Sequence, residues 1–177
     1  MRTDGVGPIS SMYRDAVEAR YGGGDRYEVA LNLMVAERRL IGTIGDVLKE
    51  HGLTRPQWSV LTILHLAPTE QIPLGRIAQT LEVHGTTITN AVDRLVDLGL
   101  AERVLDPNDR RSIFAQATPE GDRTSDAILR RLTELQFGLA ALSENEVKTL
   151  SRILSKLSPL PGPGLPSEMA QPENLPT

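Results

Sequence analysis

The stretch that decides the fold is residues 77–96, which read IAQTLEVHGTTITNAVDRLV. Apolar residues recur here at helical spacing in two runs, separated by Glu82-Val83-His84-Gly85. A helix-turn-helix needs a small residue in its first helix, a tight turn, and an apolar residue beneath the second helix. The residues with these offsets are Ala78, Glu82 and Ile88. The stretch therefore predicts a helix-turn-helix, with a glutamate where the turn usually has a glycine.

The second helix of this pair is predicted to present polar side chains. If Ile88, Val92 and Leu95 face the core, the other faces carry Thr86, Thr87, Thr89, Asn90, Asp93 and Arg94. Hydroxyls and backbone N–H groups at a helix N-terminus can bind phosphate, and asparagine can pair with adenine. These residues are candidate DNA contacts, although threonine and asparagine are also ordinary residues of a solvated helix face.

The flanking sequence predicts a mainly helical protein with one small β-hairpin. Apolar spacing upstream predicts helices over 9–21, 26–50 and 55–67, the last of which opens with a T-x-x-Q capping box. Downstream, residues 100–105 and 112–117 read as two strands joined by a tight turn. Two helices follow: one begins at Pro119 and runs through Leu142, and the other opens with the capping box of residues 143–146.

The turn of the hairpin carries Asp109, Arg110 and Arg111. A narrow minor groove concentrates negative potential and attracts arginine, and Asp109 can hold a neighbouring guanidinium in a fixed orientation. The alternative is an exposed turn whose charges pair with one another, which contributes only about 0–1 kcal/mol.

Together these segments resemble the MarR family of winged helix-turn-helix transcriptional regulators, over about residues 28 to 157. The most specific element is the hairpin pattern D-P-x-D-R-R at 106–111, followed by T-P-x-G at 118–121. The segments 53–58, 87–95 and 99–103 carry the rest of the resemblance.

The resemblance implies a homodimer that binds pseudo-palindromic double-stranded DNA and acts as a repressor released by a small-molecule effector. It places recognition helices in successive major grooves and wings in the adjacent minor grooves, with half-sites about one helical turn apart. Arg111 matches the family's wing arginine, beside Arg110, and Asp109 matches the acid that orients it. The positions that contact bases or phosphates are matched by Thr86, Thr87, Thr89, Asn90 and Arg94. Many members have a basic residue where Asn90 stands, so the operator preference cannot be copied from a relative.

The predicted organisation has five parts. Residues 1–27 form an N-terminal arm with a short helix, which Gly22-Gly23-Gly24 interrupts, and residues 28–52 form a dimerisation helix. Residues 53–118 form the winged helix-turn-helix DNA-binding lobe, and residues 119–158 form the C-terminal dimerisation helices. Residues 159–177 contain six of the 12 prolines and are predicted to be a disordered tail.

The resemblance also suggests an effector pocket between the dimerisation helices and the DNA-binding lobe. By that analogy its lining would be Leu40, Ile44, His51, Trp58, Leu61 and His65. Each residue also has a structural reading: Trp58 as a core residue, for example, and His65 as a helix histidine with a satisfied hydrogen bond. An aromatic acid is the effector class that the family suggests, and no residue here identifies it.

Composition excludes several mechanisms. The chain has no cysteine, which rules out disulfides, thiolate zinc sites and thiol-based sensing. His51, His65 and His84 form no zinc-binding pattern with nearby acids, so no metal and no cofactor are expected. No enzyme motif is present. The sequence lacks a long apolar segment, which favours a cytoplasmic protein without a membrane partner.

Charge sets a further expectation for DNA binding. The net charge is -4, and residues 74–123 hold six arginines against eight acids, so few phosphate contacts and a modest salt dependence are expected. The alternative function is a winged-helix module for protein–protein interaction without specific DNA binding. An RNA-binding role is weaker, since the hairpin carries Phe114 as its single aromatic residue.

Overall fold

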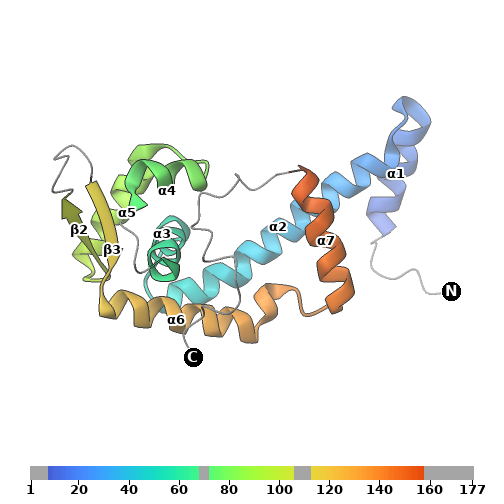
Figure 1. Ribbon diagram of the computed structural model, residues 1–177. Helices are drawn as coiled ribbons and strands as arrows, with labels where there is room; N and C mark the ends of the chain where they lie inside the picture. Colours follow the sequence, from blue (N-terminus) through green and yellow to red (C-terminus); the bar gives the residue numbers. More distant parts are fainter. Residues whose placement is uncertain (1–7, 68–71, 106–112, 158–177) are drawn as a thin grey trace. The chain divides into compact units, whose positions relative to one another are not determined.

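The structure is a computed structural model that describes residues 8–67, 72–105 and 113–157 (Figure 1). The chain forms two compact units that divide between Thr43 and Ile44. The first unit contains α1 (Pro8–Tyr21) and most of α2 (Gly24–Glu50), and the second contains the end of α2 and every later element. The described residues are mainly helical with one small sheet, which confirms the predicted fold class.

The second unit holds the predicted helix-turn-helix and its hairpin. Its elements are α3 (Arg55–Leu66), β1 (Ile72–Pro73), α4 (Leu74–Thr80), α5 (Gly85–Asp97), β2 (Ala101–Leu105), β3 (Ile113–Ala117), α6 (Pro119–Glu134), the 3-10 helix η1 (Gln136–Gly138) and α7 (Glu144–Leu157). The sheet is antiparallel with the order β1-β3-β2, and the hairpin register runs from Ala101 opposite Ala117 to Leu105 opposite Ile113. The strand β1, in which Ile72 pairs with Ala115, is an addition to the predicted elements.

The core of the second unit lies where α3 packs against α5 and α6. The side chains with no exposed surface are Val60, Leu61, Ile88, Val92, Leu95, Ala115, Ser125, Ile128 and Leu132. All except the serine are apolar, and burying each large aliphatic side chain contributes about 1.5–3 kcal/mol. The helix α6, assigned above to the dimerisation helices, therefore supplies two apolar residues to the core of this unit.

The turn between α4 and α5 is formed by Glu82, whose φ is 53°. The Glu82 N–H donates to the Gln79 carbonyl at 3.2 Å, and the Val83 N–H donates to the Ala78 carbonyl at 3.0 Å. This left-handed conformation costs a residue with a side chain roughly 1–2 kcal/mol, whereas glycine adopts it readily. Glu82, which stands where this turn usually has a glycine, therefore forms the turn at a cost in stability.

The start of α6 is fixed to the end of α5. The Thr118 hydroxyl donates to the Gly99 carbonyl at 2.7 Å and accepts from the Gly121 N–H at 3.0 Å. A Cβ atom on Gly121 would lie 1.9 Å from the Leu100 carbonyl oxygen, so this position requires glycine. The pattern T-P-x-G thus has a structural reason: it caps α6 and allows its close approach to Leu100.

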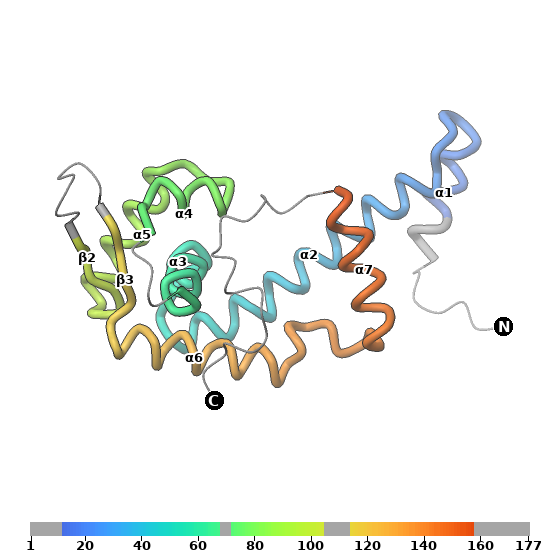
Figure 2. Tube along the Cα trace, viewed as in Figure 1, coloured from blue at the N-terminus to red at the C-terminus, as the bar shows by residue number. Residues whose placement is uncertain are grey.

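The sequence analysis predicted a helix from Pro119 through Leu142, which is longer than the helix in the structure. The helix α6 ends at Glu134, because Gln136 and Phe137 have φ values of 48° and 52° and leave the helical conformation. The chain turns there before α7, as the trace in Figure 2 shows. In α7, Glu146 accepts from the Ser143 N–H at 2.8 Å, as its capping box predicts, yet no residue of α7 is buried.

Candidate nucleic-acid interface

The helix α5 has one buried side and one exposed polar side. Ile88, Ala91, Val92 and Leu95 are buried. The predicted DNA contacts Thr86, Thr89, Asn90 and Arg94 are exposed, and Thr87 is half-buried. The structure therefore brings these five residues together on one helix and keeps four of them accessible to solvent.

Two of these side chains already have partners on the helix itself. The Thr89 hydroxyl donates to the Gly85 carbonyl at 3.1 Å. The Arg94 guanidinium lies 3.6 Å from the Asp97 carboxylate, and both side chains are exposed. Such an exposed pair is worth about 0–1 kcal/mol, so Arg94 can exchange this partner for a phosphate at little cost.

A groove runs between the start of α3 and the first turns of α5. It has a volume of about 250 Å³ and is lined by Thr54, Pro56, Gln57, Thr87, Asn90 and Ala91. The α3 side is fixed by its capping box, in which the Thr54 N–H donates to the Gln57 side-chain oxygen at 2.8 Å. Thr87 and Asn90 are thus presented at the edge of a groove as well as on the helix surface.

An ion pair that the sequence analysis missed links α5 to the hairpin. Arg103 on β2 pairs with the Asp93 carboxylate, and the Arg103 side chain is 33% exposed. In the neighbouring residue pair of the hairpin, the Gln116 side-chain amide of β3 donates to the Glu102 carboxylate of β2 at 2.5 Å. The base of the hairpin and α5 are therefore tied together by side chains as well as by the core. A signal was present, since Asp93 and Arg103 lie in segments that carry the family resemblance.

The tip of the hairpin lies outside the described residues. Asp109, Arg110 and Arg111 are therefore not placed, and their predicted roles stay predictions. The two strands that lead to them are described and pair along their whole length.

The predicted effector residues fall in different parts of the chain. Leu40 lies in the first unit and the others lie in the second. His51 is exposed beyond the end of α2, Ile44 is half-buried, and Leu61 is a fully buried core residue. Trp58 and His65 share α3 with Leu61, which brings these three together on one helix.

The contact between α3 and α6 contains a polar pair. The His65 Nδ1 atom lies 3.0 Å from an Asp122 carboxylate oxygen, with both side chains partly exposed. This contact agrees with the reading of His65 as a helix histidine with a satisfied hydrogen bond. It also places a polar pair beside the apolar core at the α3–α6 contact.

Three buried polar atoms on the same two helices have no hydrogen-bond partner within the described residues. They are the Trp58 indole nitrogen, the Thr62 hydroxyl and the Ser125 hydroxyl. A buried polar group without a partner costs about 1–3 kcal/mol, so such groups call for an explanation. The sequence analysis named Trp58 alone, because an isolated threonine and serine give no pattern that sets them apart.

Within the three described segments, no three histidine, aspartate or glutamate side chains are grouped to hold a metal ion. Over the same segments, none of the helices combines the length and hydropathy that crossing a bilayer requires.

Comparison with known proteins shows a consistent pattern. The model of the MarR family matches residues 51–112. The HTH-type transcriptional regulator MhqR of Bacillus subtilis is 29% identical over 135 residues, which are 73% of this chain and 92% of MhqR.

Solved structures extend the likeness to three dimensions. Sco5413, a MarR family transcriptional regulator from Streptomyces coelicolor, is 30% identical with a TM-score of 0.68, over 76% of this chain and 94% of that one. CouR from Rhodococcus jostii RHA1, solved with p-coumaroyl-CoA bound, is 25% identical with a TM-score of 0.64. That match covers 73% of this chain and 90% of CouR.

Proposed function

Since the chain belongs to the MarR family of transcriptional regulators, we propose that it acts as a cytoplasmic homodimeric repressor that a small-molecule effector releases from a pseudo-palindromic operator. Family membership makes it a DNA-binding regulator rather than an enzyme. The observation that carries the finer proposal is the exposed polar side of α5, which the Asp93–Arg103 pair fixes to the base of the hairpin.

The α5 surface suits the major groove. Asn90 can pair with adenine, threonine methyl groups can contact thymine, and Arg94 can bind phosphate or guanine. Arg103 pairs with Asp93 within the protein, and in this proposal it positions the hairpin. In this proposal Asp109, Arg110 and Arg111 enter the minor groove beside it.

The test begins with selection of bound duplexes from random DNA by the purified protein. Binding of the recovered duplex is then measured by fluorescence anisotropy for the wild type, Asn90→Ala and Arg111→Ala at near-physiological salt. Each substitution is expected to weaken binding by about 1–3 kcal/mol, with Asn90→Ala also relaxing sequence preference at one position of each half-site. The matched control is Arg130→Ala, which removes the same charge from an exposed site on α6 and should bind normally.

A titration with salt adds an independent measurement. The few arginines of residues 74–123 predict a shallow dependence of log affinity on log salt concentration, and Arg111→Ala should lower that slope by about 1. Selection that yields no enriched sequence, or equal binding by all variants, would contradict the proposal and favour the protein–protein interaction module.

The homodimer is supported by apolar surface at the two ends of the chain. On α2, Val29, Met34 and Val35 are 50–61% exposed. On α7, Leu154 and Leu157 are 38% and 67% exposed. Apolar side chains that their own chain leaves exposed on a helix are typical of a protein–protein interface, so in this proposal these side chains are the surface that a second copy covers. Sedimentation equilibrium should therefore give twice the chain mass at micromolar concentration.

The effector proposal rests on the buried polar atoms of α3 and α6 that have no hydrogen-bond partner in the described part of the chain. The Trp58 indole N–H can only donate, and the Thr62 and Ser125 hydroxyls can also donate, so acceptor oxygens are the ligand groups that suit these atoms. The partly exposed Trp58 ring supplies an apolar surface beside them. An aromatic carboxylate combines these two properties, and the p-coumaroyl-CoA bound by CouR likewise carries an aromatic acyl group.

The single tryptophan of the chain provides the assay. Binding of salicylate or p-coumarate should change Trp58 fluorescence and lower the affinity for the selected duplex. The paired variants Thr62→Val and Ser125→Ala should weaken the ligand while DNA binding without ligand stays normal. An unchanged fluorescence signal across an aromatic-acid panel would contradict this part of the proposal and leave the DNA-binding part standing.

A further inference from the structure

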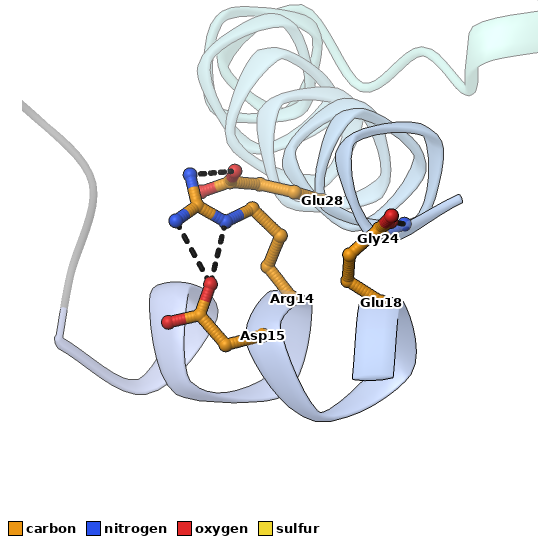
Figure 3. Close-up of polar contacts among 5 residues, drawn as sticks. All are labelled: Arg14, Asp15, Glu18, Gly24 and Glu28. Atoms are coloured by element: carbon orange, nitrogen blue, oxygen red, sulfur yellow. Dashed lines mark hydrogen bonds and ion pairs between the residues drawn. The ribbon is translucent and has the colours of Figure 1, made fainter. Parts of the chain in front are cut away.

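The N-terminal end of the chain is a built helical hairpin. We name residues 8–28, comprising α1 and the first turns of α2, the α1 hairpin. The Glu18 carboxylate accepts from the Gly24 N–H at 2.6 Å, and Arg14 contacts both Asp15, at 2.9 Å, and Glu28, at 3.8 Å (Figure 3). These contacts fix α1 against the start of α2.

Close packing leaves no room for a side chain at the turn of this hairpin. A Cβ atom on Gly24 would lie 2.5 Å from the Arg14 carbonyl oxygen and 2.9 Å from the Glu18 Cβ. Gly22 and Gly23 supply the left-handed conformations that the reversal needs, with φ values of 69° and 84°. The α1 hairpin is therefore a specific structure and not a frayed end.

The surface of the α1 hairpin is rich in exposed aromatic residues. All three tyrosines of the chain lie in it: Tyr13 is 49%, Tyr21 82% and Tyr27 36% exposed, beside Met12 at 59%. Tyrosine and methionine are enriched at protein–protein interfaces, since they combine large apolar area with a polar or adaptable end. The match to Sco5413 leaves about a quarter of this chain outside it, while nearly all of Sco5413 is matched, so the chain carries additions to the family core.

A groove of complementary character lies on α7. It has a volume of about 370 Å³ and is lined by Leu142, Asn145, Glu146, Thr149, Leu150 and Ile153. Most of its lining is apolar, while the Asn145 amide and the Thr149 hydroxyl stand at exposed positions beside it. An apolar floor with a polar edge suits a tyrosine, whose ring buries while its hydroxyl keeps a hydrogen bond.

We propose that the α1 hairpin of one protomer seats its exposed tyrosines in the α7 groove of a second copy of this chain, as an added clasp on the dimer. The occupant is a second copy because Tyr27 of the α1 hairpin and Met34 are seven residues apart on one side of α2, and Met34 belongs to the surface assigned above to the homodimer. The inference rests on the proposed homodimer and adds to it a reciprocal contact that two-fold symmetry repeats.

The absence of cysteine allows a direct test by cross-linking. Full-length Tyr13→Cys protein is mixed with full-length Thr149→Cys protein, exchanged and oxidised, and a disulfide-linked heterodimer is expected on a non-reducing gel. The matched control is Ala19→Cys, which is also exposed on α1. At about 100° per residue, Ala19 points about 120° away from Tyr13 and about 160° away from Tyr21 around the helix. The control should therefore give at least about ten-fold less heterodimer.

Equal yields from Tyr13→Cys and Ala19→Cys, or no heterodimer from either, would overturn the proposal. A chain carrying both Tyr13→Cys and Thr149→Cys that closes on itself in excess wild type would also overturn it, by showing that the hairpin occupies its own α7 groove. Circular dichroism and Trp58 fluorescence confirm that each variant is folded before mixing.

Two further measurements separate this inference from the proposed homodimer. Met34→Cys on α2 should cross-link to itself as a homodimer, and the pair Tyr13→Ser and Tyr21→Ser should raise the dimer dissociation constant about ten-fold or more. A wild-type monomer in sedimentation equilibrium would overturn the homodimer itself. A wild-type dimer that the tyrosine substitutions leave unchanged would overturn the clasp alone.

Discussion

The core helices α3, α5 and α6 and the terminal helix α7 show the same helical periodicity in sequence but opposite burial. Each of the three core helices buries at least three residues, while α7 buries none, and its Leu157 is 67% exposed. The difference teaches that an apolar stripe predicts a helix and a covered face without saying which chain covers it. The core helices are covered by their own chain, whereas α7 is covered by a second copy only in the proposed homodimer.

The largest expected effect comes from truncating matched leucines in these two regions. Leu132 of α6 has no exposed surface, whereas Leu154 of α7 is 38% exposed. Leu132→Ala should lower the free energy of unfolding by about 2–5 kcal/mol, measured by urea denaturation. Leu154→Ala should mainly raise the dimer dissociation constant. If Leu154→Ala destabilises the protein as much as Leu132→Ala at dilutions where the dimer is dissociated, α7 belongs to the core and the comparison fails.

A second substitution tests how closely the core helices fit. Gly121→Ala places a methyl group 1.9 Å from the Leu100 carbonyl oxygen and should cost about 1–3 kcal/mol or more of stability. Gly75 in α4 has no atom within 4 Å of its would-be Cβ, so Gly75→Ala should be neutral or stabilising. Thermal unfolding of the two variants should shift in opposite directions, and equal shifts would contradict the close contact at Gly121.

A smaller gain is expected at the turn of the helix-turn-helix. Glu82→Gly removes the left-handed strain of about 1–2 kcal/mol and adds the backbone entropy of glycine, about 0.5–1 kcal/mol. The net result should be a stabilisation of up to about 1.5 kcal/mol in urea denaturation. The control is Gln79→Gly in α4, an exposed helical position where glycine relieves no strain and should destabilise.

The smallest effect concerns an exposed ion pair on α6. The pKa of Asp126 is lowered, mainly by its hydrogen bond from Arg130; desolvation opposes this effect, and the charges of Arg130 and His65 lower the pKa further. Because the folded-state pKa lies below the unfolded one, the contribution is present at neutral pH and is lost as the pH falls below about 4. Arg130→Ala should move the Asp126 pKa up toward 3.8, measured by carboxyl NMR titration. A pKa that does not rise would remove Arg130 as the cause.

The sequence was sufficient for the order of the α-helices and of the hairpin in the second unit. Capping boxes at Thr54 and Ser143 and the T-P-x-G pattern marked helix starts correctly, because caps are local and depend on residues three positions apart. The end of α6 was missed, since Leu135, Leu139 and Leu142 continue the apolar spacing after the backbone has left the helix. Apolar periodicity indicates which side chains are suited to burial, but it does not determine the backbone dihedral angles of the intervening residues.

The candidate site was predictable in its residue types and not in its connections. The exposed side of α5 follows from spacing alone, as Thr86, Thr89, Asn90 and Arg94 show. The Asp93–Arg103 pair and the unpartnered Thr62 and Ser125 depend on which helices pack together, which a single sequence does not specify. The short strand β1 was missed because two residues, one of them proline, give no alternation to detect.

The joint at Thr118, Gly121 and Leu100 also determines how motion passes through the protein. The Gly121 backbone packs against the Leu100 carbonyl, and the Thr118 hydroxyl donates a hydrogen bond to the Gly99 carbonyl. The start of α6 is therefore packed directly against the segment that follows α5. We infer that a rotation of α6 would be transmitted to the last turn of α5, the helix proposed above to contact DNA, because these contacts leave no flexible link between the two. The close approach that Gly121 allows would thereby couple α6 to the proposed DNA contacts.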